Sequence, residues 1–156
     1  MLTVDKIFWL LAIGVTVVNA YIIKSRSREV ITRHPELKEG YEKIFRGYLI
    51  YLNIPWIVMG IGILAGGVSD VFDYFYPRAG NPFVLAFHLS IIILWALSIY
   101  WIYFRGGAEF LVKHPGVVNI KSVLGFKVLF ALMLLGGMFG LILMWSGDFP
   151  RLNFGR

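Results

Sequence analysis

A short motif with two side chains that can bind metals occurs twice in the chain. Residues 29–35 read Glu-Val-Ile-Thr-Arg-His-Pro, and residues 109–115, at an offset of 80, read Glu-Phe-Leu-Val-Lys-His-Pro. Carboxylate and imidazole groups are common ligands of divalent metals. The candidate metal ligands are therefore Glu29, His34, Glu109 and His114. Five residues turn a helix through about 140°, so the two ligands of one copy do not share a face. A metal would need ligands from both copies.

The same residues have a structural interpretation, which we favour. Glu29 and Glu109 would pair with neighbouring Lys or Arg side chains, and each histidine would end a helix. The residue before a proline is pushed out of the α-helical region, which explains such an ending. We therefore expect the first helix to continue to about Arg33 and the second to start near Glu36. In the second copy, Asn119 is the expected N-cap of the following helix.

His88 is the one histidine within an apolar stretch. It is a candidate axial ligand for haem or a contact for a quinone. The alternative, which we favour, is a histidine that is hydrogen-bonded between helices without a cofactor.

Asn53 and Pro55 interrupt another apolar stretch as Asn-Ile-Pro. Proline removes a backbone hydrogen bond and usually kinks a helix. This predicts a helix break, which either lines a polar cavity or is closed by packing, and we favour packing.

Two basic residues are candidates for contact with lipid headgroups. Lys127 lies near the start of an apolar stretch, where its long stem can reach the membrane interface. Arg46 ends a basic loop, and such loops attract anionic headgroups. Two small-residue motifs, at residues 62 and 66 and at residues 136 and 140, are expected to allow close packing of helices.

Four apolar stretches must position these residues, at 4–23, 48–67, 83–104 and 123–145. Each is long enough for the roughly 20 helical residues that cross a bilayer. The composition agrees, since 58% of the 156 residues are hydrophobic, 15% are charged and the mean hydropathy is +0.74. An ordinary soluble domain is more polar. The absence of cysteine excludes disulfides, thiolate metal sites and a cysteine nucleophile.

The expected fold is an all-α integral membrane protein with four transmembrane helices. It forms one domain of two sequential helical hairpins, 1–80 and 81–156. The repeated motif falls in the connecting turn of each hairpin, which favours an internal duplication with both copies in the same orientation.

The distribution of lysine and arginine along the chain predicts which side of the membrane each loop faces. Seven lie in residues 24–47 and three in residues 105–122, against four on the opposite side, namely Lys6, Arg78, Arg151 and Arg156. Cytoplasmic loops are enriched in basic residues. We therefore expect both loops in the cytoplasm and both termini outside, in a plasma or inner membrane.

No sequence motif identifies a reaction. The chain has no phosphate-binding loop, dinucleotide fingerprint or nucleic-acid motif, and no acidic residue is expected inside a span apart from Asp5 at the edge of the first. We expect a non-catalytic accessory or scaffold subunit of a larger membrane complex, or a homo-oligomer. Its partners would be the lipid bilayer and other membrane subunits, with no nucleic acid. The alternatives are a small transporter or channel built from the two hairpins, and a haem- or quinone-binding redox subunit that uses His88.

Overall fold

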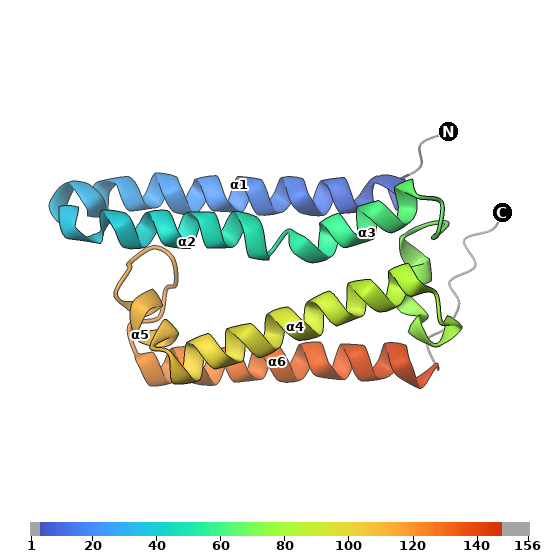
Figure 1. The fold of residues 1–156 in the computed structure, drawn as a ribbon. Helices are drawn as coiled ribbons and strands as arrows, with labels where there is room; N and C mark the ends of the chain where they lie inside the picture. Colours follow the sequence, from blue (N-terminus) through green and yellow to red (C-terminus); the bar gives the residue numbers. More distant parts are fainter. Residues whose placement is uncertain (1–3, 148–156) are drawn as a thin grey trace.

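The computed structural model describes residues 4–147, which fold into helices with no β-strand in that range. Four segments are long and apolar enough to cross a membrane, as the sequence predicts (Figure 1). These are α1 (Val4–Arg33), the combined segment Pro35–Leu64, α4 (Pro82–Phe104) and α6 (Val123–Ser146). The combined segment contains η1 (Pro35–Leu37), α2 (Lys38–Tyr51) and α3 (Ile54–Leu64). Short helices occupy the connections, namely η2 (Val71–Phe75), η3 (Pro77–Ala79) and α5 (Gly107–Val112).

The helices form two hairpins that lie side by side (Figure 1). Hairpin one consists of α1 against α2 and α3, and hairpin two consists of α4, α5 and α6. We call the end that holds the start of α1, residues 65–81 and the end of α6 the termini end, and the end that holds residues 34–37 and 105–122 the turn end. Two residues counted in the charge analysis, Arg151 and Arg156, lie outside the described residues.

Most helix ends follow the local sequence. α1 ends at Arg33, and α2 begins soon after the His-Pro step. At the start of α4, Asn81 Oδ1 accepts a hydrogen bond from the Phe83 amide at 2.9 Å, and Pro82 occupies the first turn.

The prediction that Asn119 caps the last helix is wrong. Ser122, and not Asn119, caps α6, because its hydroxyl accepts a hydrogen bond from the Gly125 amide at 3.2 Å. The chain is still turning at Gly116, which has a φ of +84°. Residues 119–122 also lie outside any helix, so α6 begins only at Val123.

A core at the termini end joins hairpin one to hairpin two. Its buried residues are Met59, Val68, Val71, Tyr74, Val84 and Phe87. The Tyr74 hydroxyl donates to the Met59 carbonyl at 3.0 Å. Burial, together with the nearby Asp73 carboxylate, raises the pKa of Tyr74 to about 12. The loop helix η2 thus closes this end of the molecule.

Hairpin two is held together along the seam between α4 and α6. The Trp95 ring lies against Gly137, where an added Cβ would be 2.7 Å from the ring. Near the turn end, the Tyr103 hydroxyl donates to the Lys127 carbonyl at 2.7 Å. A second small core there consists of Ile102, Ala108 and Phe126.

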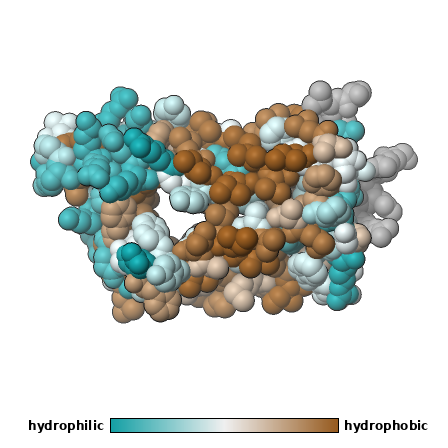
Figure 2. All heavy atoms as spheres, viewed as in Figure 1, coloured by the Kyte–Doolittle hydropathy of each residue, from teal (hydrophilic) through white to brown (hydrophobic). Residues whose placement is uncertain are grey.

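The surface separates into an apolar middle and a polar turn end. Figure 2 shows apolar side chains over the middle of the hairpins and hydrophilic ones gathered at the turn end. It also shows an opening between the two hairpins, on the side of the turn end. This distribution matches helices that lie in a bilayer with one end in water.

Candidate functional site

The second copy of the repeated motif docks on hairpin one at the turn end. His114 is 3% exposed, and its ring lies so close to Gly40 that an added Cβ would overlap the imidazole. The Tyr41 ring meets the His114 ring edge to face, with centroids 4.9 Å apart. The Tyr41 hydroxyl donates to the Pro115 carbonyl at 2.7 Å. The His-Pro turn of hairpin two therefore packs onto the start of α2.

The hydrogen bond of His114 fixes its protonation pattern. Its Nδ1 lies 2.6 Å from the Phe110 carbonyl, and a carbonyl can only accept, so Nδ1 carries the proton. In the neutral ring, Nε2 then carries a lone pair, and this nitrogen lies against Gly40. Phe110 also packs on the ring, with centroids 4.5 Å apart. His114 is thus enclosed by protein on both sides.

The first copy of the motif is exposed instead. Glu29 forms an ion pair with Arg33 one turn later in α1. His34 lies 3.2 Å from the Glu36 carboxylate, measured from Nδ1 to Oε1, and both side chains are mostly exposed. A groove of about 280 Å³ separates this copy from Pro115 and is lined by Glu29, Val30, Arg33, His34 and Pro115.

The four candidate metal ligands are not gathered into one site. Within residues 4–147, no group of three or more His, Asp or Glu side chains is placed to hold a metal ion. Glu109 pairs with Lys127 and Glu29 with Arg33, while His114 is enclosed against Gly40. Glu29 pairs with a basic residue of its own helix, whereas Glu109 pairs with a lysine of another helix.

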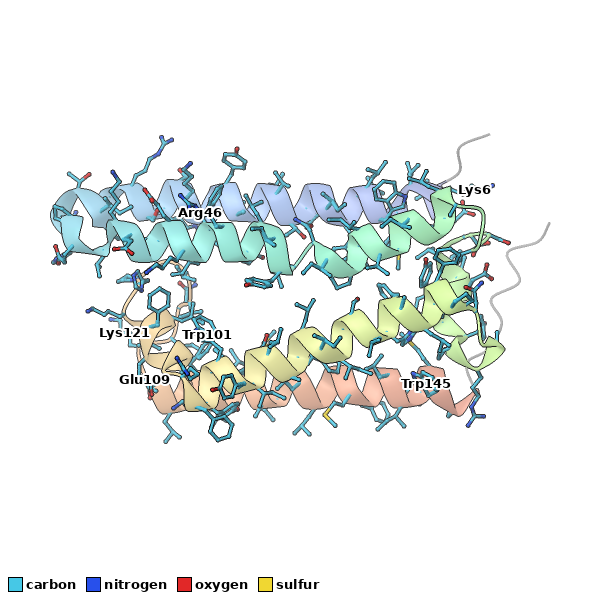
Figure 3. The ribbon with its side chains drawn as sticks, viewed as in Figure 1. Lys6, Arg46, Trp101, Glu109, Lys121 and Trp145 are labelled. Carbon is cyan, nitrogen blue, oxygen red and sulfur yellow. The ribbon has the colours of Figure 1, made fainter. Side chains whose placement is uncertain are left out.

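Lys127 forms an ion pair at the turn end, and its contact with lipid headgroups stays a prediction. Its Nζ lies 3.0 Å from Glu109 Oε1, and its side chain is 25% exposed. A hydrogen bond from its own backbone amide, followed by the one from Lys127, holds the pKa of Glu109 below the usual 4.5. Figure 3 shows Glu109 at the turn end and Arg46 on α2. Arg46 is exposed, so its contact with lipid headgroups stays a prediction.

The break expected at Asn53 and Pro55 is confirmed. α2 ends at Tyr51 and α3 begins at Ile54, with Asn53 as the N-cap residue. The Asn53 amide nitrogen donates to the Leu49 carbonyl at 2.7 Å. Asn53 is 5% exposed, and its Oδ1 has no hydrogen-bond partner in the described part of the chain. Asn53 and Pro55 are both buried, so the helix break is packed against protein.

His88 is buried in hairpin two. The expected hydrogen bond to another helix is absent among residues 4–147. The His88 Nδ1 donates to the Val84 carbonyl of its own helix at 2.9 Å. Nε2 is buried and has no partner among residues 4–147. Phe87 and Trp145 meet the ring edge to face, with centroid distances of 5.5 Å and 6.1 Å. A bulky cofactor could reach Nε2 only if neighbouring side chains moved.

Comparisons with protein-family models, with curated proteins and with solved structures find no match to this chain. The function has to be inferred from the residues themselves.

The contact of the second turn with Gly40 and Tyr41 was not predicted from the sequence. They contact a turn that lies 74 residues further along the chain, measured from Tyr41 to Pro115. One signal was available, since Gly-Tyr is an uncharged pair within the highly charged stretch Lys-Glu-Gly-Tyr-Glu-Lys.

Proposed function

We propose that the chain is an integral protein of a plasma or inner membrane, with residues 24–47 and 105–122 in the cytoplasm and both termini outside. The excess of Lys and Arg in these two loops supports this orientation.

An internal duplication of the hairpin is part of this proposal. Each copy of the motif spans the end of a helix, since α1 ends at Arg33 and α5 ends at Val112. In both copies the histidine amide donates back into the preceding helix, from His34 to Val30 four residues earlier and from His114 to Leu111 three residues earlier.

Within that membrane we propose a non-catalytic role as an accessory or scaffold subunit, in a larger complex or in a homo-oligomer. The observation that carries this proposal is the exposed apolar surface of α6. No residue is buried in the most apolar part of α6. In the most apolar part of the segment Pro35–Leu64, 22% of the residues are buried. Membrane helices associate through close packing at small residues. Gly136 and Gly140 on α6 have open space where a Cβ would project.

Native mass spectrometry after mild-detergent extraction tests this function. We expect the 17.8 kDa chain to be recovered with additional protein mass, either other subunits or further copies of itself. Gly140→Leu should reduce that association, because it places a bulky side chain on the open face of α6. Gly14→Leu is the matched control, since Gly14 also has open space but lies on α1. Recovery of monomer alone would contradict the proposal.

A second candidate function is a redox subunit that holds haem or a quinone at His88. The bare Nε2 favours it, because a ligating histidine commonly donates its other N–H to a backbone carbonyl, as His88 does to Val84. In such a subunit Nε2 would coordinate the haem iron or accept a hydrogen bond from a quinol. Purification from haem-sufficient cells should then give a Soret band that His88→Ala removes. A colourless wild-type protein would exclude the haem version.

A further inference from the structure

The two hairpins contact each other at both ends of the molecule. Near the termini end, α3 packs along α4, and the buried core there includes residues of both hairpins. At the turn end, residues 114–116 lie against α1 and α2. Between these two regions the surface is open (Figure 2). The position of one hairpin relative to the other at the turn end therefore depends on the contacts of this turn.

The turn is rigidly attached to hairpin two. Ala108 is fully buried in the small core, and an added Cβ at Gly107 would collide with Trp101. The ion pair between Glu109 and Lys127 joins α5 to α6. Since α5 is held on both sides, the turn that follows it must move with hairpin two.

The contact of the turn with hairpin one is small and specific. It consists of the Tyr41–Pro115 hydrogen bond, the edge-to-face contact of Tyr41 with His114, and the seat of His114 on Gly40. Gly116, with a φ of +84°, lies within van der Waals distance of Arg26, since an added Cβ would be 3.6 Å from the Arg26 Cβ. No ion pair joins the two hairpins among the residues described. Loss of this seat would leave each hairpin's own packing unchanged.

We propose that the His114–Pro115 turn is a latch. Docked on Gly40 and Tyr41, it holds the turn ends of the two hairpins together. When it is released, the hairpins separate at the turn end and stay joined where α3 packs on α4. The latch thereby controls the width of the opening between the hairpins on the side of the turn end. This inference does not depend on the proposed scaffold role.

Pulsed electron paramagnetic resonance on protein in bilayers tests the latch. The chain has no cysteine, so spin labels can be placed without removing native thiols. One label pair replaces Arg46 on α2 and Lys121 in the second turn, both exposed at the turn end (Figure 3). A second pair replaces Ile61 on α3 and Leu89 on α4, which are 53% and 57% exposed.

Gly40→Val should lengthen the distance between labels at 46 and 121, because its side chain occupies the seat of His114. Gly47→Val is the matched control in the same helix, since an added Cβ there meets only an ordinary contact of 3.7 Å with Tyr51. The distance between labels at 61 and 89 should stay unchanged in both variants. Tyr41→Phe keeps the ring but loses the hydrogen bond to Pro115, so it should lengthen the distance at the turn end by less.

Two results would overturn the latch. One is an unchanged distance between labels at 46 and 121 in both Gly40→Val and Tyr41→Phe. The other is an equal change at both label pairs, because a latch acts at one end only. If Gly40→Val does not fold, the Tyr41→Phe distances decide the question alone.

Discussion

Glu109 and Lys127 link α5 to α6 by an ion pair of 3.0 Å. Since the pKa of Glu109 is lowered in the folded protein, its ionised form stabilises the fold. This stabilisation is complete above the ordinary pKa of 4.5 and is lost as the pH falls through the lower pKa of the folded state. We therefore expect the thermal midpoint of the wild type to fall more on acidification than that of Glu109→Gln.

Circular dichroism melts in detergent, from about pH 7 down to about pH 3, measure this difference across the range in which the carboxyl titrates. Glu42→Gln is a suitable control, because Glu42 is an exposed glutamate at the same end. Its melts should follow the wild type at every pH. Parallel melts of wild type and Glu109→Gln would show that the ion pair does not stabilise the fold.

Gly136 and Gly137 are neighbours in α6 with opposite surroundings. An added Cβ at Gly137 would lie 2.7 Å from the Trp95 ring, whereas nothing lies within 4 Å of one at Gly136. Overpacking typically costs about 1–3 kcal/mol, so Gly137→Ala should lower the free energy of unfolding by that amount. Gly136→Ala should raise it by up to about 1 kcal/mol, because alanine favours the helix.

Unfolding of both variants in sodium dodecyl sulfate, followed by circular dichroism, compares them directly. Equal stabilities would mean that α6 does not pack on Trp95 as described. The comparison is sensitive because the two substitutions are chemically identical and differ only in what surrounds the added methyl group.

The break between α2 and α3 tests how proline shapes a membrane helix. Pro55 has no amide hydrogen to donate, so the helix cannot continue through it without loss. Pro55→Ala should allow residues 51–57 to join into one helix, with slower amide hydrogen exchange there. Pro82→Ala is the control, because Pro82 stands in the first turn of α4, where an amide has no partner inside the helix. Unchanged exchange at residues 51–57 would mean that Asn53 and the surrounding packing cause the break.

Helices and their ends could be predicted where local chemistry sets them. The cap at Asn81, the end of α1 at Arg33 and the break before Pro55 each depend on a few adjacent residues. Ser122 caps α6 in place of Asn119, and it is a favoured N-cap residue directly before the apolar stretch 123–145.

The contacts of the candidate site were less predictable than the helices. The sequence indicated that Glu109 would find a basic partner, but not that the partner would be Lys127 on another helix. The seat of His114 on Gly40 depends on how the two hairpins meet, and neither residue has a periodic pattern that points to the other. The small-residue motif pointed to positions 136 and 140, but the glycine that packs against Trp95 is Gly137.

The excess positive charge of the whole molecule is gathered at the turn end. Residues 24–46 and 105–127 hold eleven of the 15 basic residues and five of the nine acidic ones. The rest of the chain has four of each, so the net charge of +6 belongs entirely to this end. Positive charge on short loops resists transfer across a membrane. The turn end should therefore remain on the cytoplasmic side.

Single cysteines placed in this cysteine-free chain can report that orientation. Thr32→Cys lies at the turn end and Ala79→Cys at the termini end, and both positions are exposed. Neither substitution alters a charge. A membrane-impermeant maleimide should label the cysteine at 79 in intact cells, or in spheroplasts if an outer membrane is present. It should label the cysteine at 32 only after the membrane is permeabilised. The reverse pattern would place the basic turns outside, and the charge distribution would then have to reflect an anionic partner on that side and not the threading of the helices.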